Sequence, residues 1–148
     1  MEELFELRTC LEQGRYIDAM ALLGEMEEMS KDDKINKIRS FLVVLLLHLI
    51  KKDAQKRTTR SWEVSIRNAV REISQINKRR KAGGHYLKKE ELRETVQEAY
   101  EPALDNAALE AFEGHYSESE LAEMVDEEKI RKEALQLILE GQAKTKRN

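Results

Sequence analysis

The chain has 148 residues, of which 37% are charged and 5% aromatic, and its formal net charge at pH 7 is −3. A chain of this length fits one compact domain that buries roughly two thirds of its unfolded surface. Its single cysteine, Cys10, excludes an internal disulfide and a site with several thiolate ligands. The acidic start MEELFELRTC lacks the basic residues and cleavage site of a secretion signal, so we expect a cytoplasmic protein.

Residues that favour helices dominate, and proline occurs once. We therefore expect an all-α fold, a single-domain bundle of about six helices around a buried central helix. The first two helices are predicted over residues 3–13 and 16–29 from apolar residues at helical spacing. In the second of these helices, Ile17, Met20 and Leu23 should face the core.

The run FLVVLLLHLI at residues 41–50 is apolar at every position except His48. Such a run has no polar face, so it should be enclosed in the centre of the molecule. We expect Ser30 to cap the helix that contains it, with the helix beginning near Lys31. The run is shorter than the roughly 20 apolar residues that cross a bilayer, so no membrane association is expected.

Three more helices are predicted after the central one. The first begins near Ser61, the second covers residues 88–112, and the third starts with the capping box at Ser117 and closes at Gly141. The resulting division is a helical core over residues 1–114, followed by a C-terminal helix and polar tail over 115–148. We expect this last part to act as an arm for dimerisation or for a partner, because its apolar residues are divided into two clusters.

Charge is unevenly distributed along the chain. Residues 51–89 contain thirteen Lys and Arg against three acids, whereas residues 90–141 contain sixteen acids against four basic residues. The basic segment surrounds Trp62, and such a surface is typical of binding to phosphate or nucleic acid. The predicted binding residues are Lys56, Arg57, Arg60, Arg67, Arg71, Arg79 and Arg80. Alternatively, these cations pair with the acidic C-terminal helices, within one chain or across a dimer.

The usual motifs of catalysis and phosphate binding, such as HExxH, CxxC, GxGxxG and GxSxG, are missing from the sequence. The catalytic residues are therefore unknown, and His48 and Lys51, three positions apart on one helical face, are the candidates for an acid–base or phosphate-binding pair. A core role for His48 is favoured over a catalytic one. The remaining histidines, His85 and His115, are scattered, so we expect no metal and no cofactor.

The segment from Ile35 to Ile73 resembles a bacterial family catalogued as domain of unknown function 29. Members carry an LLLHLLK-type helix, a short basic connection and an SW dipeptide that opens the next helix. The corresponding residues here are Leu45 to Lys51 and Ser61-Trp62. The resemblance extends over about residues 16–112 and departs beyond Gly114. It implies an all-helical fold and assigns neither an activity nor catalytic residues.

These features predict a non-enzymatic helical module that binds a macromolecule, as a homodimer or with a protein partner. One version is a nucleic-acid-associated or antitoxin-like regulator that uses the basic segment. One alternative is a small hydrolase or nuclease with a site around His48, Lys51 and Arg57. A second alternative is a structural module for oligomerisation.

Overall fold

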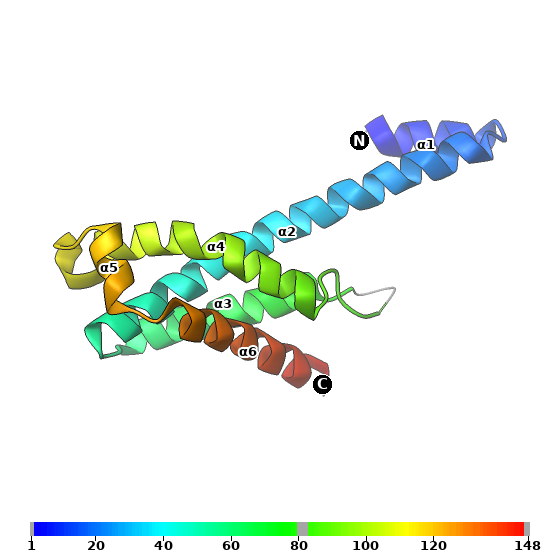
Figure 1. Ribbon diagram of the computed structural model, residues 1–148. Coiled ribbons are helices and arrows are strands. Elements are labelled where there is room, and N and C mark those ends of the chain that lie inside the picture. The colour runs from blue at the N-terminus through cyan, green and yellow to red at the C-terminus, as the bar shows by residue number, and fades with distance from the viewer. Residues whose placement is uncertain (1, 80–82, 147–148) are drawn as a thin grey trace. The chain divides into compact units, whose positions relative to one another are not determined.

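The structure, a computed structural model, describes residues 2–79 and 83–146. In order, the elements are α1 (Glu2–Glu12), α2 (Tyr16–Gln55), α3 (Arg60–Asn77), α4 (Lys89–Glu110), the short 3-10 helix η1 (Ala111–Gly114), α5 (Glu118–Met124) and α6 (Glu127–Lys146) (Figure 1). These described parts contain six α-helices and no β-strand. The predicted all-α helical bundle is confirmed.

The chain divides into two compact units, one ending at Lys34 and the other beginning at Ile35. This division lies inside α2, whereas the predicted division between a helical core and a C-terminal arm was at residue 114. Helix α6 packs on α3 and α4, so the C-terminal helix contributes to the core of the second unit.

The first unit consists of α1 and the beginning of α2, joined at Gly14. Gly14 has a φ of +73°, a left-handed conformation that glycine adopts without strain and that lets the chain reverse between the helices. The buried residues described in this unit are Cys10 and Ala19. Ile17 and Met20 are 87% and 67% exposed, so the prediction that they face a core is wrong. The short helix α1 offers the beginning of α2 too little opposing surface to cover such side chains.

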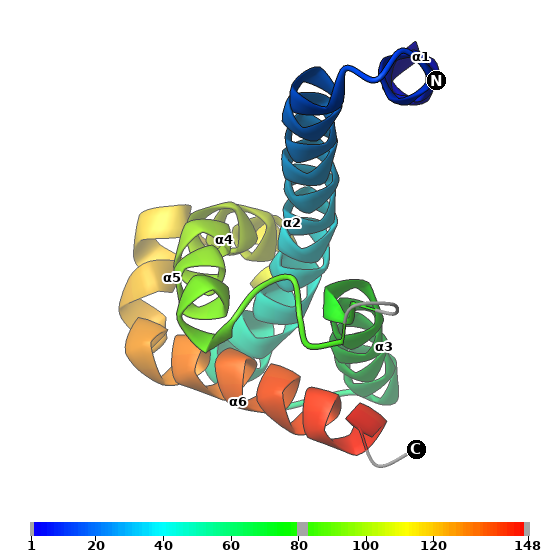
Figure 2. The ribbon, with the colours of Figure 1, turned by 90° about the vertical axis from the view of Figure 1, so that its right-hand side faces the viewer.

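The second unit is built around the apolar run of α2. Leu42, Leu45, Leu46 and Ile50 are fully buried, and burying each such side chain contributes about 1.5–3 kcal/mol. Figure 2 shows α3, α4 and α6 around this part of α2. The residues that complete the same core from these helices include Ile66, Ile73, Leu92, Val96, Ile130 and Ile138. The predicted buried central helix is confirmed.

The predicted helix boundary at Ser30 is wrong, because α2 continues through it without interruption. An N-cap residue has an extended backbone, so a new helix can begin at Ser30 only if the preceding helix ends before it. No proline or glycine ends that helix here. Ser30 is therefore an exposed residue inside a long helix.

The last predicted helix is divided into α5 and α6 at Val125, whose backbone is extended (φ −124°, ψ 157°). Its predicted start is correct, since Ser117 and Glu120 form the capping box. The new helix start is held by Asp126, whose carboxylate accepts a hydrogen bond from Lys129 N at 3.2 Å. Asp53, in α2, accepts a second one from Asp126 N at 3.1 Å. These contacts join the beginning of α6 to the end of α2.

Gly141 does not close the last helix, as the sequence suggested, but lies inside α6. A Cβ atom at this position would lie 2.7 Å from Val70 Cγ1 and 3.0 Å from Ser74 Oγ. The glycine is therefore required by the close approach of α6 to α3, and not by the end of the helix.

Candidate functional site

The beginning of α3 is fixed by local hydrogen bonding. Thr59 has an extended backbone, and its hydroxyl accepts a hydrogen bond from Trp62 N at 3.0 Å. Before it, Lys56 adopts a φ of +54°, which ends α2 and turns the chain. This short connection places Arg57 and Arg60 at the start of α3, close to the position that the sequence predicted.

Three cations lie along the exposed side of α3, and a fourth follows at its C-cap. We call these four residues the α3 cation face: Arg60, Arg67, Arg71 and the C-cap residue Lys78. Since a helix turns by about 100° per residue, the spacing of seven and four places Arg60, Arg67 and Arg71 within about 40° around the helix axis. All four residues are exposed. The opposite side of α3 carries Ile66, Ala69 and Ile73, which are buried.

The α3 cation face keeps its positive charge. Within the described residues, Arg60, Arg67 and Lys78 form no ion pair, while Arg71 Nη1 donates to the neutral Asn68 Oδ1 at 3.4 Å. The acid nearest to the helix start, Glu63, is already paired with Lys52 at 2.7 Å. The hydrogen bond from Lys52, followed by that from Thr58, lowers the pKa of Glu63.

The other predicted binding residues lie close to this face in the sequence. Arg57 stacks its guanidinium on the ring of Trp62, with its Cζ 4.7 Å from the ring centroid, and Arg79 lies 5.8 Å from the ring of Tyr86. Lys56 pairs with Asp53 at 3.4 Å. Arg80 lies outside the described residues. None of these predicted cations pairs with α4, α5 or α6 in the described residues, whereas Lys51 of the same basic segment pairs with Glu110 of α4. Pairing across a dimer stays a prediction.

Lys51, one of the two predicted catalytic residues, connects three helices. Its side chain is 8% exposed, and its Nζ lies 3.1 Å from Glu110 Oε1 in α4 and 4.5 Å from the ring centroid of Trp62 in α3. A cation placed between a carboxylate and an aromatic face is well stabilised in this position. The geometry supports a structural role for Lys51.

His48, the other predicted catalytic residue, is partly exposed, and its Nδ1 lies 2.8 Å from the carbonyl oxygen of Val44 in the same helix. The tautomer with a proton on Nδ1 satisfies this bond and leaves Nε2 as an acceptor. A catalytic pairing of His48 with Lys51 stays a prediction.

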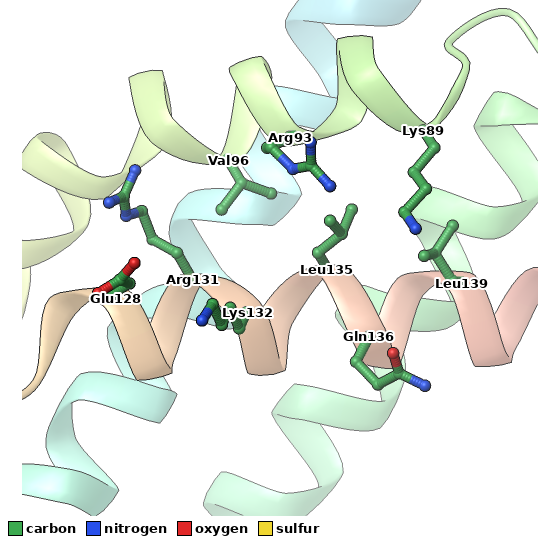
Figure 3. Close-up of a pocket in the computed structure, with 9 residues that line it drawn as sticks. All are labelled: Lys89, Arg93, Val96, Glu128, Arg131, Lys132, Leu135, Gln136 and Leu139. Atoms are coloured by element: carbon green, nitrogen blue, oxygen red, sulfur yellow. The ribbon is translucent and has the colours of Figure 1, made fainter.

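A groove lies between α4 and α6, and it was not predicted from the sequence. It has a volume of about 490 Å³ and is lined by Lys89, Arg93, Val96, Glu128, Arg131, Lys132, Leu135, Gln136 and Leu139 (Figure 3). Residues 90–141 read as an acidic segment with only four basic residues. Three of those four, Arg93, Arg131 and Lys132, meet in this groove. The strongest sequence signal for it was the cationic pair at Lys89 and Arg93, one helical turn apart.

A cluster of metal-binding side chains and a membrane-crossing helix are both absent from the described ranges, 2–79 and 83–146. They contain no group of three or more His, Cys, Asp or Glu side chains placed to hold a metal ion. None of their helices has the combination of length and apolar character that a membrane-crossing helix requires.

The fold and the α3 cation face define an all-α helical protein with a positively charged surface helix. The chain belongs to the family described as Domain of unknown function DUF29, which matches residues 6–135. The match extends beyond Gly114 through α5 and into α6, so the expectation that the resemblance ends at Gly114 is wrong. No curated protein and no solved structure is significantly similar to the chain.

Proposed function

We propose that the protein is a helical binding module that holds nucleic acid against the α3 cation face. The observation that carries this proposal is the alignment of four exposed cations, none of them in an ion pair within the described residues. Phosphates supply most of the affinity in binding of this kind, because each contact with Lys or Arg releases condensed counterions.

The dimensions of the α3 cation face suit a phosphate backbone. At 1.5 Å per residue, the distance from Arg60 to Lys78 along α3 is about 27 Å, which corresponds to about eight base pairs of a duplex. Arg57 and Arg79 extend the row of cations at its two ends, each beside an aromatic ring. Arginine and lysine on a single helix face contact phosphates without reading base edges, so the proposed binding is independent of sequence.

The test is fluorescence anisotropy with labelled single-stranded and duplex oligonucleotides over a series of salt concentrations. The double variant Arg67→Gln, Arg71→Gln should weaken binding at low salt and reduce the slope of log K against log salt by about two. Arg8→Gln with Arg15→Gln, which removes two exposed cations from the first unit, is the matched control. Binding that does not respond to salt, or equal losses in both double variants, would contradict the proposal.

A second candidate function, self-association, is favoured by a different observation. The first unit exposes a large set of apolar side chains while it buries only Cys10 and Ala19 among its described residues. The exposed ones are Leu4, Phe5, Leu11, Tyr16, Ile17, Met20, Leu23 and Met29. Large exposed apolar surfaces on soluble proteins mark interaction sites.

We infer that a second copy of the chain covers this apolar surface. Two identical helix pairs can form a four-helix bundle. In such a bundle the exposed apolar side chains of each pair would be buried against those of the other. Residues 2–34 contain ten acids against four basic residues, so the two copies repel each other at low salt. Self-association should therefore strengthen with salt, in the direction opposite to nucleic-acid binding.

Sedimentation equilibrium at micromolar concentration tests this second function. The double variant Phe5→Ser, Ile17→Ser should be monomeric, whereas Leu109→Ser, which removes a comparably exposed apolar side chain from α4, should leave the dimer unchanged. A wild-type protein that stays monomeric in high salt would rule out the dimer.

A further inference from the structure

We propose that the groove between α4 and α6 binds a small organic anion that carries an apolar chain. The groove is separate from the α3 cation face, and none of its lining residues comes from α3. Its volume of about 490 Å³ lies within the range of small-molecule sites, which is roughly 300–1,000 Å³.

The charge of the lining selects an anion. Four cations, Lys89, Arg93, Arg131 and Lys132, face a single carboxylate, Glu128, in a chain whose net charge is negative. Arg93 and Arg131 have carboxylate partners outside the lining, so Lys89 and Lys132 are the cations whose charge a bound anion would neutralise.

The cations of the groove differ in how they are held. Arg93 Nη1 is fixed by Glu90 Oε2 at 2.8 Å, while Arg131 Nε lies 3.5 Å from Glu127 Oε2. Within the described residues, Lys89 and Lys132 have no carboxylate at ion-pair distance. In Figure 3, Lys89 and Arg93 extend from α4 toward α6. The two lysines are therefore available to a ligand that enters between the helices.

The floor of the groove selects the apolar part of the ligand. Val96, Leu135 and Leu139 line it, and Figure 3 shows the two leucines pointing from α6 toward α4 beside the cationic side chains. A hydrocarbon chain laid on these residues buries apolar surface at about 25 cal/mol per Å². An inorganic ion would leave this part of the site unused.

One lining residue, Arg131, and one residue outside the lining, Tyr100, carry buried polar groups. Arg131 Nε and Tyr100 Oη are buried without a hydrogen-bond partner among the described groups. Tyr100 lies one helical turn beyond Val96 and outside the groove lining; burial, together with the charges of Glu127, Asp53 and Asp126, raises the pKa of its phenol to about 12 against the opposing charge of Arg131. Arg131 Nε has the Glu127 carboxylate at 3.5 Å, so the donor left without an acceptor is the Tyr100 hydroxyl, at a cost of about 1–3 kcal/mol.

The test is isothermal titration calorimetry of the full chain with octyl phosphate as the probe, compared with inorganic phosphate and with octanol. Octyl phosphate should bind at least about tenfold more tightly than either of the others, because only it engages both the cations and the apolar floor. Equal binding of octyl phosphate and octanol would show that the cations contribute nothing and would overturn the proposal.

Variants locate the binding. Lys89→Gln with Lys132→Gln should weaken the binding of octyl phosphate by at least about tenfold. Lys144→Gln, which removes an exposed cation from α6 outside the groove lining, is the matched control and should bind as the wild type does. If instead Phe5→Ser with Ile17→Ser abolishes binding, the probe has bound the apolar surface of the first unit, and the proposal fails.

The same experiment is independent of the nucleic-acid proposal. Arg67→Gln with Arg71→Gln should leave the binding of octyl phosphate unchanged, because neither residue lines the groove. A loss in that variant would place the anion on α3 and would overturn this inference without touching the proposed function.

Discussion

Asn77 and Gln142 are joined by a buried hydrogen bond of 2.8 Å between their side chains, although 65 positions separate them in the sequence. The Asn77 amide nitrogen also donates to the carbonyl oxygen of Leu87 at 3.1 Å, and its amide oxygen accepts from Leu87 N at 2.7 Å. One side chain thereby connects the end of α3, the approach to α4 and the last turns of α6.

Replacing Asn77 by leucine should lower the free energy of unfolding by about 2–4 kcal/mol, because it leaves buried backbone and amide groups of Leu87 and Gln142 without partners. Urea denaturation followed by circular dichroism measures this change. Asn68→Leu, at an exposed position of the same helix, should change the stability by less than about 0.5 kcal/mol. Similar losses in the two variants would mean that the buried bonds contribute little.

The two helical glycines Gly24 and Gly141 should respond in opposite ways to alanine. A Cβ at Gly141 meets Val70 Cγ1 at 2.7 Å, whereas a Cβ at Gly24 has no atom within 4 Å. Gly141→Ala should therefore destabilise the second unit by about 1–3 kcal/mol through overpacking, and Gly24→Ala should stabilise α2 by up to about 1 kcal/mol. Thermal denaturation compares the two, and adding Val70→Ala to Gly141→Ala should restore part of the loss. A neutral Gly141→Ala would show that α6 has room to move away.

The ion pair of Lys51 and Glu110 should respond asymmetrically to substitution. Lys51→Met replaces a buried ammonium with an apolar chain of similar length and should change the free energy of unfolding by less than about 1.5 kcal/mol. Glu110→Ala leaves the buried cation without its carboxylate and should cost more than Lys51→Met does. A double-mutant cycle in urea measures the coupling between the two. A severe loss in Lys51→Met with none in Glu110→Ala would contradict the structural role.

Tyr100 should make the protein less stable in alkaline solution. Burial, together with Glu127 and Asp53, raises the pKa of its phenol from 10.0 to about 12. Because the folded pKa is above the unfolded one, the contribution of Tyr100 is fully present below pH 10 and is lost as the pH rises through about 12. Urea midpoints measured over this range should fall with pH in the wild type and fall less steeply in Tyr100→Phe. Parallel curves for the two proteins would argue against the raised pKa.

Features encoded by a few neighbouring residues were predictable. The run at residues 41–50 has no polar face, so its burial follows from the sequence alone, and the capping box at Ser117 is a local pattern that the structure repeats. The start of α3 at Arg60 was predicted within one residue, since the helix was expected to begin near Ser61 and Trp62.

Features that depend on distant parts of the chain were not predictable. Gly141 resembles a helix end by sequence, and only the approach of Val70 shows that the helix continues through it. Ser30 has the chemistry of an N-cap, but whether a helix begins there depends on whether the preceding one stops. Arg93 of α4 and Arg131 and Lys132 of α6 line the same groove. A count of charges along the sequence does not show that these three cations lie together.

The order in which the core is completed has a consequence during synthesis on the ribosome. The apolar run of α2 emerges about 80 residues before Ile130 and Ile138, which belong to the same core. At about 5–20 residues per second, the nascent chain carries that run uncovered for several seconds. We therefore expect chaperones to bind the unfinished polypeptide. A protein truncated before α6 should be insoluble.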